Sequence, residues 1–203
     1  MTSTQAPNHH AHYPSFRGTK GAIAALSMVF GRDACTDLAI RLAEPRPSDR
    51  LVDVGCGPGA GARTLAKQVA HVTATDPAPV MLRVARLIPS PRNITWVRAS
   101  ADDLAMDSAS ANVVTALATV HHWSELDASC REIRRVLAPG GRFVAIERRI
   151  ASTTAEGLAS HGWTPEQGAR FAEVCLNTGF ASAAASVEHE DGTEYVAVIA
   201  RVD

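Results

Sequence analysis

Residues 51–61 read Leu-Val-Asp-Val-Gly-Cys-Gly-Pro-Gly-Ala-Gly, a largely apolar run that passes into four alternate glycines. The run Arg50–Val54 is typical of a buried parallel strand, which carries apolar residues on both of its faces. Glycine lets the backbone turn sharply and lets a ligand approach where a Cβ would clash. We therefore predict a strand, a tight turn that holds a ligand, and a helix over 60–69.

The alternation of strand and helix continues along the whole chain. Strands alternating with helices form a parallel sheet covered on both faces, because right-handed crossovers place the helices outside it. A closing hairpin over 184–200, turning at Asp191-Gly192, adds an antiparallel strand. The predicted class is α/β, with ligands at the carboxyl ends of the strands. Further strands are predicted at 71–75, 94–97, 112–117 and 142–148, and further helices at 20–30, 35–42, 77–87, 126–137 and 164–178.

Composition limits the function classes. The 203 residues suit one domain over 19–203, preceded by a polar, flexible tail over 1–18. Twenty basic residues nearly balance 21 acidic ones, which argues against a nucleic-acid binder or an anionic-membrane binder. Apolar runs stay short of the roughly 18 residues that span a bilayer. The four cysteines are widely separated, and the polar start lacks a signal-peptide core, so we expect a cytoplasmic protein.

Two classes of nucleoside ligand compete for the glycine turn. A dinucleotide turn has the spacing G-x-G-x-x-G and offers a helix N-terminus to a pyrophosphate, whereas the spacing here is G-x-G-x-G. Asp53, two residues before the first glycine, is an awkward neighbour for a phosphate and suits a cation. S-adenosylmethionine carries a sulfonium and an ammonium and no phosphate, and attraction over about 4 Å is worth several kcal/mol at most. The turn therefore favours S-adenosylmethionine over a nicotinamide dinucleotide.

Two more acids follow the next strands. Asp76 ends the second strand, where a carboxylate can accept hydrogen bonds from both ribose hydroxyls, and Asp102 follows the third, within reach of an adenine amino group. A single Asp in such a place is more often a turn-former or a helix cap. Three acids that end three successive strands beside a glycine turn reverse that preference.

With these residues the chain resembles class I S-adenosylmethionine-dependent methyltransferases, in the small-molecule group that includes ubiquinone-pathway enzymes. The resemblance implies a Rossmann-like, doubly wound sheet of seven strands in the order 3-2-1-4-5-7-6, with strand 7 antiparallel. It is carried by four stretches: LVDVGCGPGAGA (51–62), VTATDPAPVML (72–82), VRASADDL (97–104) and REIRRVLAPGGRFVAIE (131–147).

The resemblance also implies which residues hold the cofactor. Asp53 and the first three glycines of the turn are expected to hold the methionine part of the cofactor. Asp76 is expected to bind the ribose, and Pro77 and Met81 to flank it. A short segment after the third strand goes to the adenine, and one residue after the fourth strand lines the cofactor. N-terminal aromatic and basic residues often close over the cofactor in this group, Phe16 among them here. The candidates are Tyr13, Arg17, Asp53, Gly55, Gly57, Gly59, Asp76, Pro77, Met81, Ala101, Asp102 and Ala118.

The residues after the fourth strand bear on catalysis. A hydroxyl acceptor needs a base to remove its proton as it attacks, and histidine suits that role near neutral pH. His121-His122 lies where the acceptor is expected, and we favour His121 as the base, with His122 and Glu147 orienting it or sharing the proton. Such a pair can also serve only to pack or to hold a loop. An Asp…Asp-Asn metal set is absent from the sequence, so no metal is predicted.

The predicted function is S-adenosylmethionine-dependent O-methylation of a small polar metabolite, with a saccharide or glycoside as the suggested acceptor. N- or C-methylation of a quinone precursor or natural product is the first alternative. A non-catalytic cofactor-binding or scaffold protein is the alternative from another class. Little sequence separates the fifth strand from the helix at Thr164. We therefore expect an acceptor site that is open, or is completed by the tail or by the second subunit of a homodimer.

Overall fold

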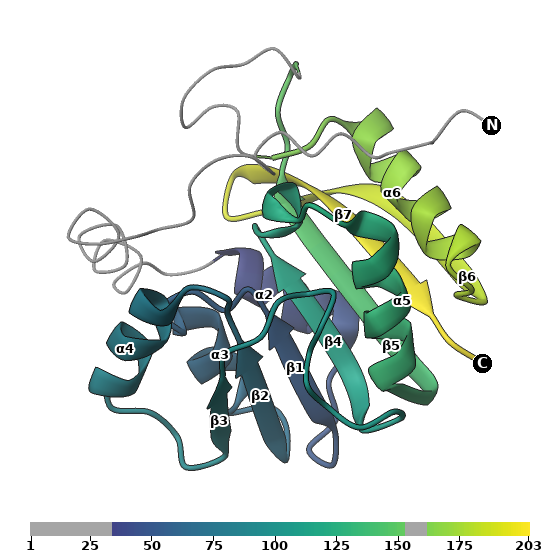
Figure 1. The fold of residues 1–203 in the computed structure, drawn as a ribbon. Coiled ribbons are helices and arrows are strands. Elements are labelled where there is room, and N and C mark those ends of the chain that lie inside the picture. Colours follow the sequence, from purple (N-terminus) through teal and green to yellow (C-terminus); the bar gives the residue numbers. More distant parts are fainter. Residues whose placement is uncertain (1–33, 153–161) are drawn as a thin grey trace.

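The computed structural model describes residues 34–152 and 162–203, which form one seven-stranded sheet with helices on both faces (Figure 1). The strand order is β3-β2-β1-β4-β5-β7-β6. Neighbouring strands from β3 to β5 pair in parallel, and β7 pairs antiparallel with both β5 and β6. The predicted fold class and strand order are confirmed. The strands are β1 (Arg50–Val54), β2 (His71–Thr75), β3 (Ile94–Val97), β4 (Ala111–Leu117), β5 (Leu137–Arg148), β6 (Ser182–Glu190) and β7 (Thr193–Arg201).

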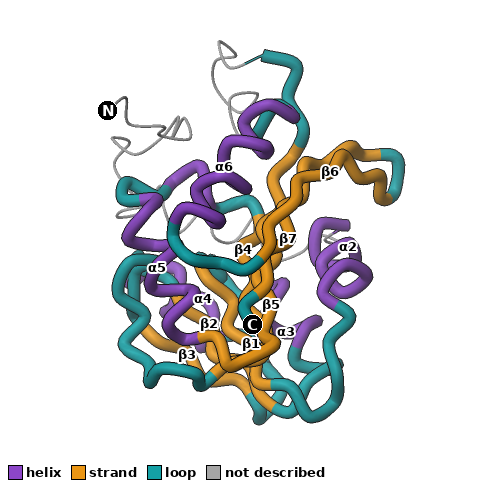
Figure 2. Tube along the Cα trace, turned by 90° about the vertical axis from the view of Figure 1, so that its right-hand side faces the viewer, coloured by secondary structure: helices purple, strands orange, loops and turns teal. Residues whose placement is uncertain are grey.

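The helices divide between the two faces of the sheet. Figure 2 shows α2 and α3 on one side of the sheet and α5 and α6 on the other. The helix α4 lies beside α3, because Arg63 of α3 donates to the Ala85 carbonyl of α4 at 2.9 Å. Each face has its own apolar core, because successive strand residues point to opposite sides. Leu51 packs in the cluster under α2 and α3, and Val52 packs in the cluster under α5 and α6. The helices are α2 (Ala34–Ala43), α3 (Ala60–Leu65), α4 (Pro79–Leu87), the 3₁₀ turn η1 (Val120–His122), α5 (Leu126–Val136) and α6 (Pro165–Asn177).

Two helix boundaries differ from the sequence prediction because side chains from elsewhere bind the backbone there. The helix predicted from Pro77 begins at Pro79, since the Asp76 carboxylate accepts from the Ala78 N–H at 2.8 Å and Ala78 is extended. The helix predicted to reach residue 69 ends at Leu65. There the Asn93 amide donates to three carbonyls that follow α3, at 2.8 Å, 3.1 Å and 3.4 Å, and satisfies them outside a helix.

The second half of the chain follows the prediction more closely. Thr164 and Gln167 form the expected capping box at the start of α6, each side chain accepting from the other's backbone N–H. The turn between β6 and β7 has positive φ at Asp191 and Gly192, as a tight hairpin requires. β5 begins at Leu137 rather than at residue 142, because Leu137 already pairs with Ala111 before a register shift.

Several expectations lie outside the described residues. They concern the helix over 20–30, the tail over 1–18, and the cofactor-closing candidates Tyr13, Phe16 and Arg17. Within 34–152 and 162–203, α6 is the longest helix with 13 residues, and none of the helices has the length and apolar content to cross a membrane.

Candidate functional site

The glycine turn lies at the carboxyl end of β1 and is fastened to β2 by backbone hydrogen bonds. The N–H groups of Gly55 and Cys56 donate to the Thr75 carbonyl at 2.8 Å and 2.9 Å. The next glycine, Gly57, donates its N–H to the Asp76 carboxylate at 2.9 Å. Gly55, Gly57 and Gly59 all have positive φ, between 54° and 82°, where L side chains are strained. The turn therefore needs glycine at these positions for its backbone shape.

The three glycines face different surroundings. A Cβ at Gly55 would lie 2.8–2.9 Å from carbons of Thr119, and a Cβ at Gly59 would lie 2.6 Å from a carbon of the Trp96 ring. A Cβ at Gly57 would meet no described atom within 4 Å. Gly55 and Gly59 thus permit close packing inside the protein. Gly57 is the glycine whose backbone an outside ligand can approach.

Two buried acids make the surroundings of the turn negative. Asp76 is 7% exposed, and its two oxygens accept from the backbone N–H groups of Gly57 and Ala78. Burial raises the pKa of Asp76, and these two hydrogen bonds oppose the rise. Asp53 is buried and accepts from the Thr115 hydroxyl at 3.0 Å. The pKa of the Cys56 thiol is well above its usual value, first through burial and then through the charges of Asp53 and Asp76.

A cavity of about 250 Å³ opens beside the turn, at the carboxyl ends of the strands. Five of the predicted site residues line it: Gly55, Pro77, Ala101, Asp102 and His122. The sequence interpretation missed the other lining residues, although one ends β1 and most of the rest lie in the segments that follow β3 and β4, where such sheets bind ligands. These are Val54, Ala99, Ser100, Thr119, Trp123, Ser124, Glu125 and Ser129.

The two adjacent histidines have different environments. His121 is 2% exposed, and its Nδ1 lies 2.8 Å from a carboxylate oxygen of Glu147, which is itself 1% exposed. The other Glu147 oxygen accepts from the His121 backbone N–H at 3.2 Å. His122 is exposed and lines the cavity. The structure thus places His122, rather than the favoured His121, among the cavity-lining residues, and it places Glu147 behind His121.

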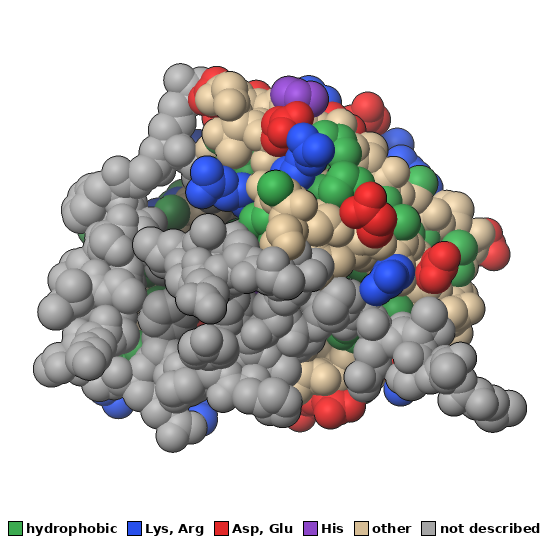
Figure 3. Space-filling view, turned by 90° about the horizontal axis from the view of Figure 1, so that it is seen from above, with side chains coloured by type: hydrophobic (Ala, Val, Ile, Leu, Met, Phe, Trp, Pro, Cys, Tyr) green, Lys and Arg blue, Asp and Glu red, His purple; other side chains and the backbone are tan. Residues whose placement is uncertain are grey.

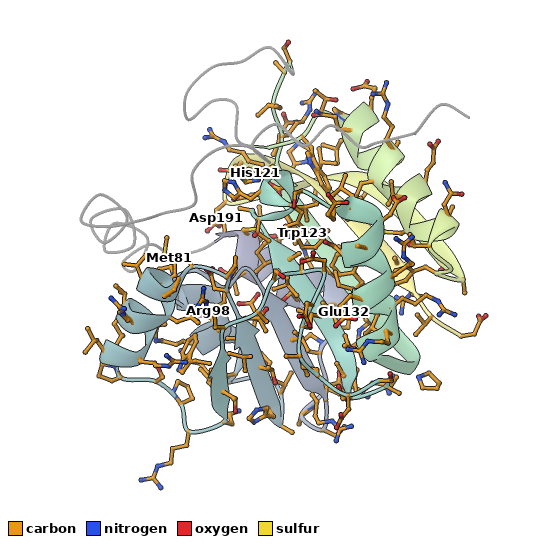
Figure 4. The ribbon with its side chains drawn as sticks, viewed as in Figure 1. Met81, Arg98, His121, Trp123, Glu132 and Asp191 are labelled. Atoms are coloured by element: carbon orange, nitrogen blue, oxygen red, sulfur yellow. The ribbon has the colours of Figure 1, made fainter. Side chains whose placement is uncertain are left out.

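The segment that carries these histidines is anchored at both ends. Ala118, which directly follows β4, has φ of 51°, an unfavourable conformation for a residue with a Cβ, and its N–H donates to the Ile146 carbonyl at 2.8 Å. Trp123 packs its ring against Phe143 and Phe171, with centroids 6.4 Å and 6.3 Å away. Figure 4 shows His121 and Trp123 together above the carboxyl end of β4. The backbone that presents His122 to the cavity is therefore held from both sides.

The remaining predicted residues lie around the cavity rather than in its lining. Met81 is buried in α4 and packs with Ala78, the first residue after Pro77. Met81 marks the upper end of α4 in Figure 4. Ala118 is exposed at the end of β4. Among the described residues, no three His, Cys, Asp or Glu side chains come close enough together to hold a metal ion.

S-adenosylmethionine fits the residues that are present. The backbone at Gly57 is open to a ligand, and the adjoining carboxylates of Asp53 and Asp76 suit its positive sulfonium and ammonium groups. Asp76 has two lone-pair sites on each oxygen, so it retains acceptor capacity for ribose hydroxyls beside its two backbone bonds. Asp102 is exposed on the cavity wall, where it can accept from an amino group.

The face of the molecule above the strand ends is viewed in Figure 3. Acidic and basic side chains are interspersed on the part of this face that belongs to described residues. A single-sign patch of the kind that binds a polyanion is therefore not seen on that part. The expectation that the chain does not bind nucleic acid stays a prediction.

Sequence relatives point to methyl transfer. Residues 52–145 match a family model described as a methyltransferase domain. The chain is 32% identical over 108 residues to the ubiquinone/menaquinone biosynthesis C-methyltransferase UbiE of Rubrivivax gelatinosus, covering 53% of this chain and 43% of that protein. It is 36% identical over 113 residues to the ubiquinone biosynthesis O-methyltransferase of Xylella fastidiosa, covering 53% and 46%. The chain thus spans less than half the length of these two relatives.

Solved structures agree on the fold. A methyltransferase from Aquifex aeolicus that depends on S-adenosylmethionine aligns with a TM-score of 0.74 at 14% identity, covering 90% of this chain and 98% of that one. The [4+2]-cyclase SpnF aligns with a TM-score of 0.67 at 18% identity, covering 96% and 86%. Proteins named for two different reactions share this fold, so the fold does not determine the reaction. The matched domain, the strand order and the relatives together support the class I S-adenosylmethionine-dependent methyltransferase family for this chain.

Proposed function

We propose that the chain transfers a methyl group from S-adenosylmethionine to a hydroxyl of a small polar acceptor bound beside His122. The observation that carries this proposal is the cavity next to the glycine turn, where His122 is accessible and polar groups surround it. Four hydroxyl-bearing side chains line the same cavity and can donate or accept hydrogen bonds. They are Ser100, Thr119, Ser124 and Ser129.

Removing the proton of the acceptor hydroxyl is the step that the protein itself must catalyse. When bound, S-adenosylmethionine supplies an electrophilic methyl group on its sulfonium. An acceptor hydroxyl is a weak nucleophile until its proton is removed, and a ring nitrogen of neutral His122 takes that proton as the oxygen attacks. The buried His121–Glu147 pair holds the η1 turn and so keeps His122 at the cavity. Alignment of the acceptor by the cavity wall supplies the remaining catalysis.

The charges of the cavity bear on the acceptor class. Apart from Asp102, which is expected to hold the adenine, Glu125 contributes a carboxylate, and the described residues of the lining include no Lys or Arg. Such a wall disfavours acceptors that carry phosphate or carboxylate and suits neutral or cationic ones. A neutral polyhydroxylated acceptor, such as a saccharide or glycoside, fits the hydroxyl-rich lining.

A second candidate is methylation of a quinone precursor, on carbon or on oxygen. It is favoured by the names of the two relatives, which act in ubiquinone or menaquinone biosynthesis. The apolar part of the cavity wall, which includes Val54, Pro77 and Trp123, is compatible with an aromatic ring. Carbon methylation leaves less work for a histidine base than methylation of an aliphatic hydroxyl does.

The experiment is an acceptor screen with methyl-labelled S-adenosylmethionine, using neutral saccharides, phosphorylated saccharides and quinone precursors. For the acceptor found, His122→Ala should lower kcat by about 10²–10⁴-fold while leaving the affinity for S-adenosylhomocysteine nearly unchanged. His71→Ala is the matched control, because His71 contacts Thr95 at the start of β2, at the opposite end of the sheet. Turnover retained by His122→Ala would refute the base role. Cofactor binding without methyl transfer to any acceptor would favour a non-catalytic protein.

A further inference from the structure

We infer that Arg63 is a positioning residue that holds the glycine turn and α4 in the arrangement that binds the cofactor, an inference that rests on the proposed function. Arg63 lies in α3, directly behind the turn. Its guanidinium makes three hydrogen bonds to three separate segments. Nη1 donates to the Pro58 carbonyl in the turn at 2.9 Å, and Nη2 donates to the Ala85 carbonyl in α4 at 2.9 Å. Nε donates to the Ser90 hydroxyl, beyond α4, at 3.0 Å.

A tryptophan links Arg63 to the turn a second time. The guanidinium carbon lies 5.5 Å from the centre of the Trp96 ring, a cation–π distance. Gly59 packs on the same ring, so closely that a Cβ there would lie 2.6 Å from a ring carbon and 3.3 Å from Arg63 Nη1. Trp96 belongs to β3, so Arg63 also ties the turn to the edge of the sheet.

The segments that Arg63 joins are those on which the cofactor site depends. Pro58 directly follows Gly57, whose N–H reaches Asp76 and whose backbone faces open space. α4 follows Asp76 and Pro77 and carries Met81. A guanidinium presents five donors in a rigid plane, so it fixes both distance and angle between the groups it joins, which a lysine cannot do. Without Arg63, the turn and α4 lose the side chain that hydrogen-bonds to both of them. A ligand must then order these two segments as it binds, which weakens its affinity.

Electrostatics and positioning predict opposite signs for the loss of Arg63. S-adenosylmethionine has a net positive charge, so removing a nearby cation would by charge alone tighten its binding. Weaker binding in an Arg63 variant therefore reports the loss of positioning. S-adenosylhomocysteine has no net charge, and positioning should weaken its binding by the same factor.

The test compares Arg63→Met with Arg86→Met by calorimetric titration, using S-adenosylhomocysteine and S-adenosylmethionine. Arg86 is the matched control, because it is an exposed arginine that donates to the Trp96 carbonyl at 2.9 Å but makes no hydrogen bond to the turn within the described part of the chain. We expect Arg63→Met to weaken both ligands by about tenfold, and Arg86→Met to stay within about twofold of the wild type. KM for S-adenosylmethionine should rise while kcat is largely kept, since the acceptor side is untouched.

Arg63→Lys covers the case in which Arg63→Met does not fold. It keeps the charge but not the three directed bonds, and it should also weaken both ligands while Arg86→Lys does not. Equal affinities in the Arg63 and Arg86 variants, measured where all are folded, would overturn the inference. A wild-type chain that binds neither ligand would refute the proposed function itself, and the inference with it.

Discussion

Glycines of the turn have two roles, ligand approach at Gly57 and close internal packing at Gly55. Substituting each of them by alanine, which adds one methyl group, separates the two roles. Gly57→Ala adds a Cβ that meets no described atom within 4 Å, at a residue with φ of 54°. Its cost in the free chain is therefore that of the left-handed conformation alone, about 1–2 kcal/mol. Gly55→Ala adds a Cβ within 2.8–2.9 Å of the buried Thr119 carbons, at φ of 72°. The backbone cost there is joined by overpacking, so we expect about 2–5 kcal/mol.

The effect on ligand affinity, taken relative to the loss of stability, should be larger for Gly57→Ala than for Gly55→Ala. If the space above Gly57 belongs to the cofactor, the added methyl displaces it from the backbone. We expect affinity for S-adenosylhomocysteine to fall by about tenfold or more, which is at least about 1.4 kcal/mol. Gly57→Ala should thus be the milder change for folding and a severe one for the ligand.

The assay has two arms. Urea denaturation without ligand gives the free energy of unfolding, and calorimetric titration with S-adenosylhomocysteine gives the affinity of the folded fraction. Gly192→Ala is the control for the backbone cost, because Gly192 has φ of 73°, has no described atom within 4 Å of an added Cβ, and lies in the β6–β7 hairpin. Wild-type affinity in Gly57→Ala would show that the open space is not the ligand's. A larger stability loss for Gly57→Ala than for Gly55→Ala would refute the packing argument.

Two further predictions concern acids around the site. The Glu132 carboxylate accepts from Arg135 and from the Leu104 N–H. The hydrogen bond from Arg135 lowers the pKa of Glu132 in the folded chain. The stabilising effect of ionised Glu132 is therefore present above pH 4.5 and is lost as pH falls through the lower folded-state pKa. Glu132→Gln should therefore cost about 1 kcal/mol at neutral pH and almost nothing in acid, checked by urea denaturation; a pH-independent cost would contradict this. Glu147→Ala should cost about 3–5 kcal/mol, because it removes the acceptor of buried His121, and Glu147→Gln should cost less. Thermal unfolding of both variants checks the order, which equal costs would contradict.

The sheet was largely predictable from the sequence because its strands carry their own signals. The bounds predicted for β1, β2 and β3 agree with the structure, since each is a short run that contains β-branched residues. The order of the strands follows from right-handed crossovers together with the family resemblance. Helix ends were less predictable, because side-chain hydrogen bonds to the backbone decide them, whether the side chain is distant in sequence or adjacent. Asn93 ends α3 in this way, and Asp76 delays α4.

The roles of single residues within the glycine motif depend on contacts that the motif itself does not encode. Sequence patterns treat the three glycines as one ligand-binding unit. In the structure Gly55 packs on Thr119 and Gly59 packs on Trp96, whereas a Cβ at Gly57 meets none of the described residues within 4 Å. Thr119 and Trp96 belong to other strand ends, so only the assembled sheet brings them to the turn.

The two histidines show the same limit at the catalytic position. The sequence places both directly after β4, at the edge where an acceptor is expected, and it offers no periodic pattern to tell them apart. In the structure they belong to a 3₁₀ turn, and their rings lie together with centroids 4.0 Å apart, so burial and partners rather than direction tell them apart. Glu147, on the neighbouring strand β5, takes His121 into the interior, and Trp123 fixes the far end of the segment. His122 therefore lines the cavity, and we assign the proposed base role to it. The reason is the bond between His121 and Glu147 of β5, which the His-His motif itself does not indicate.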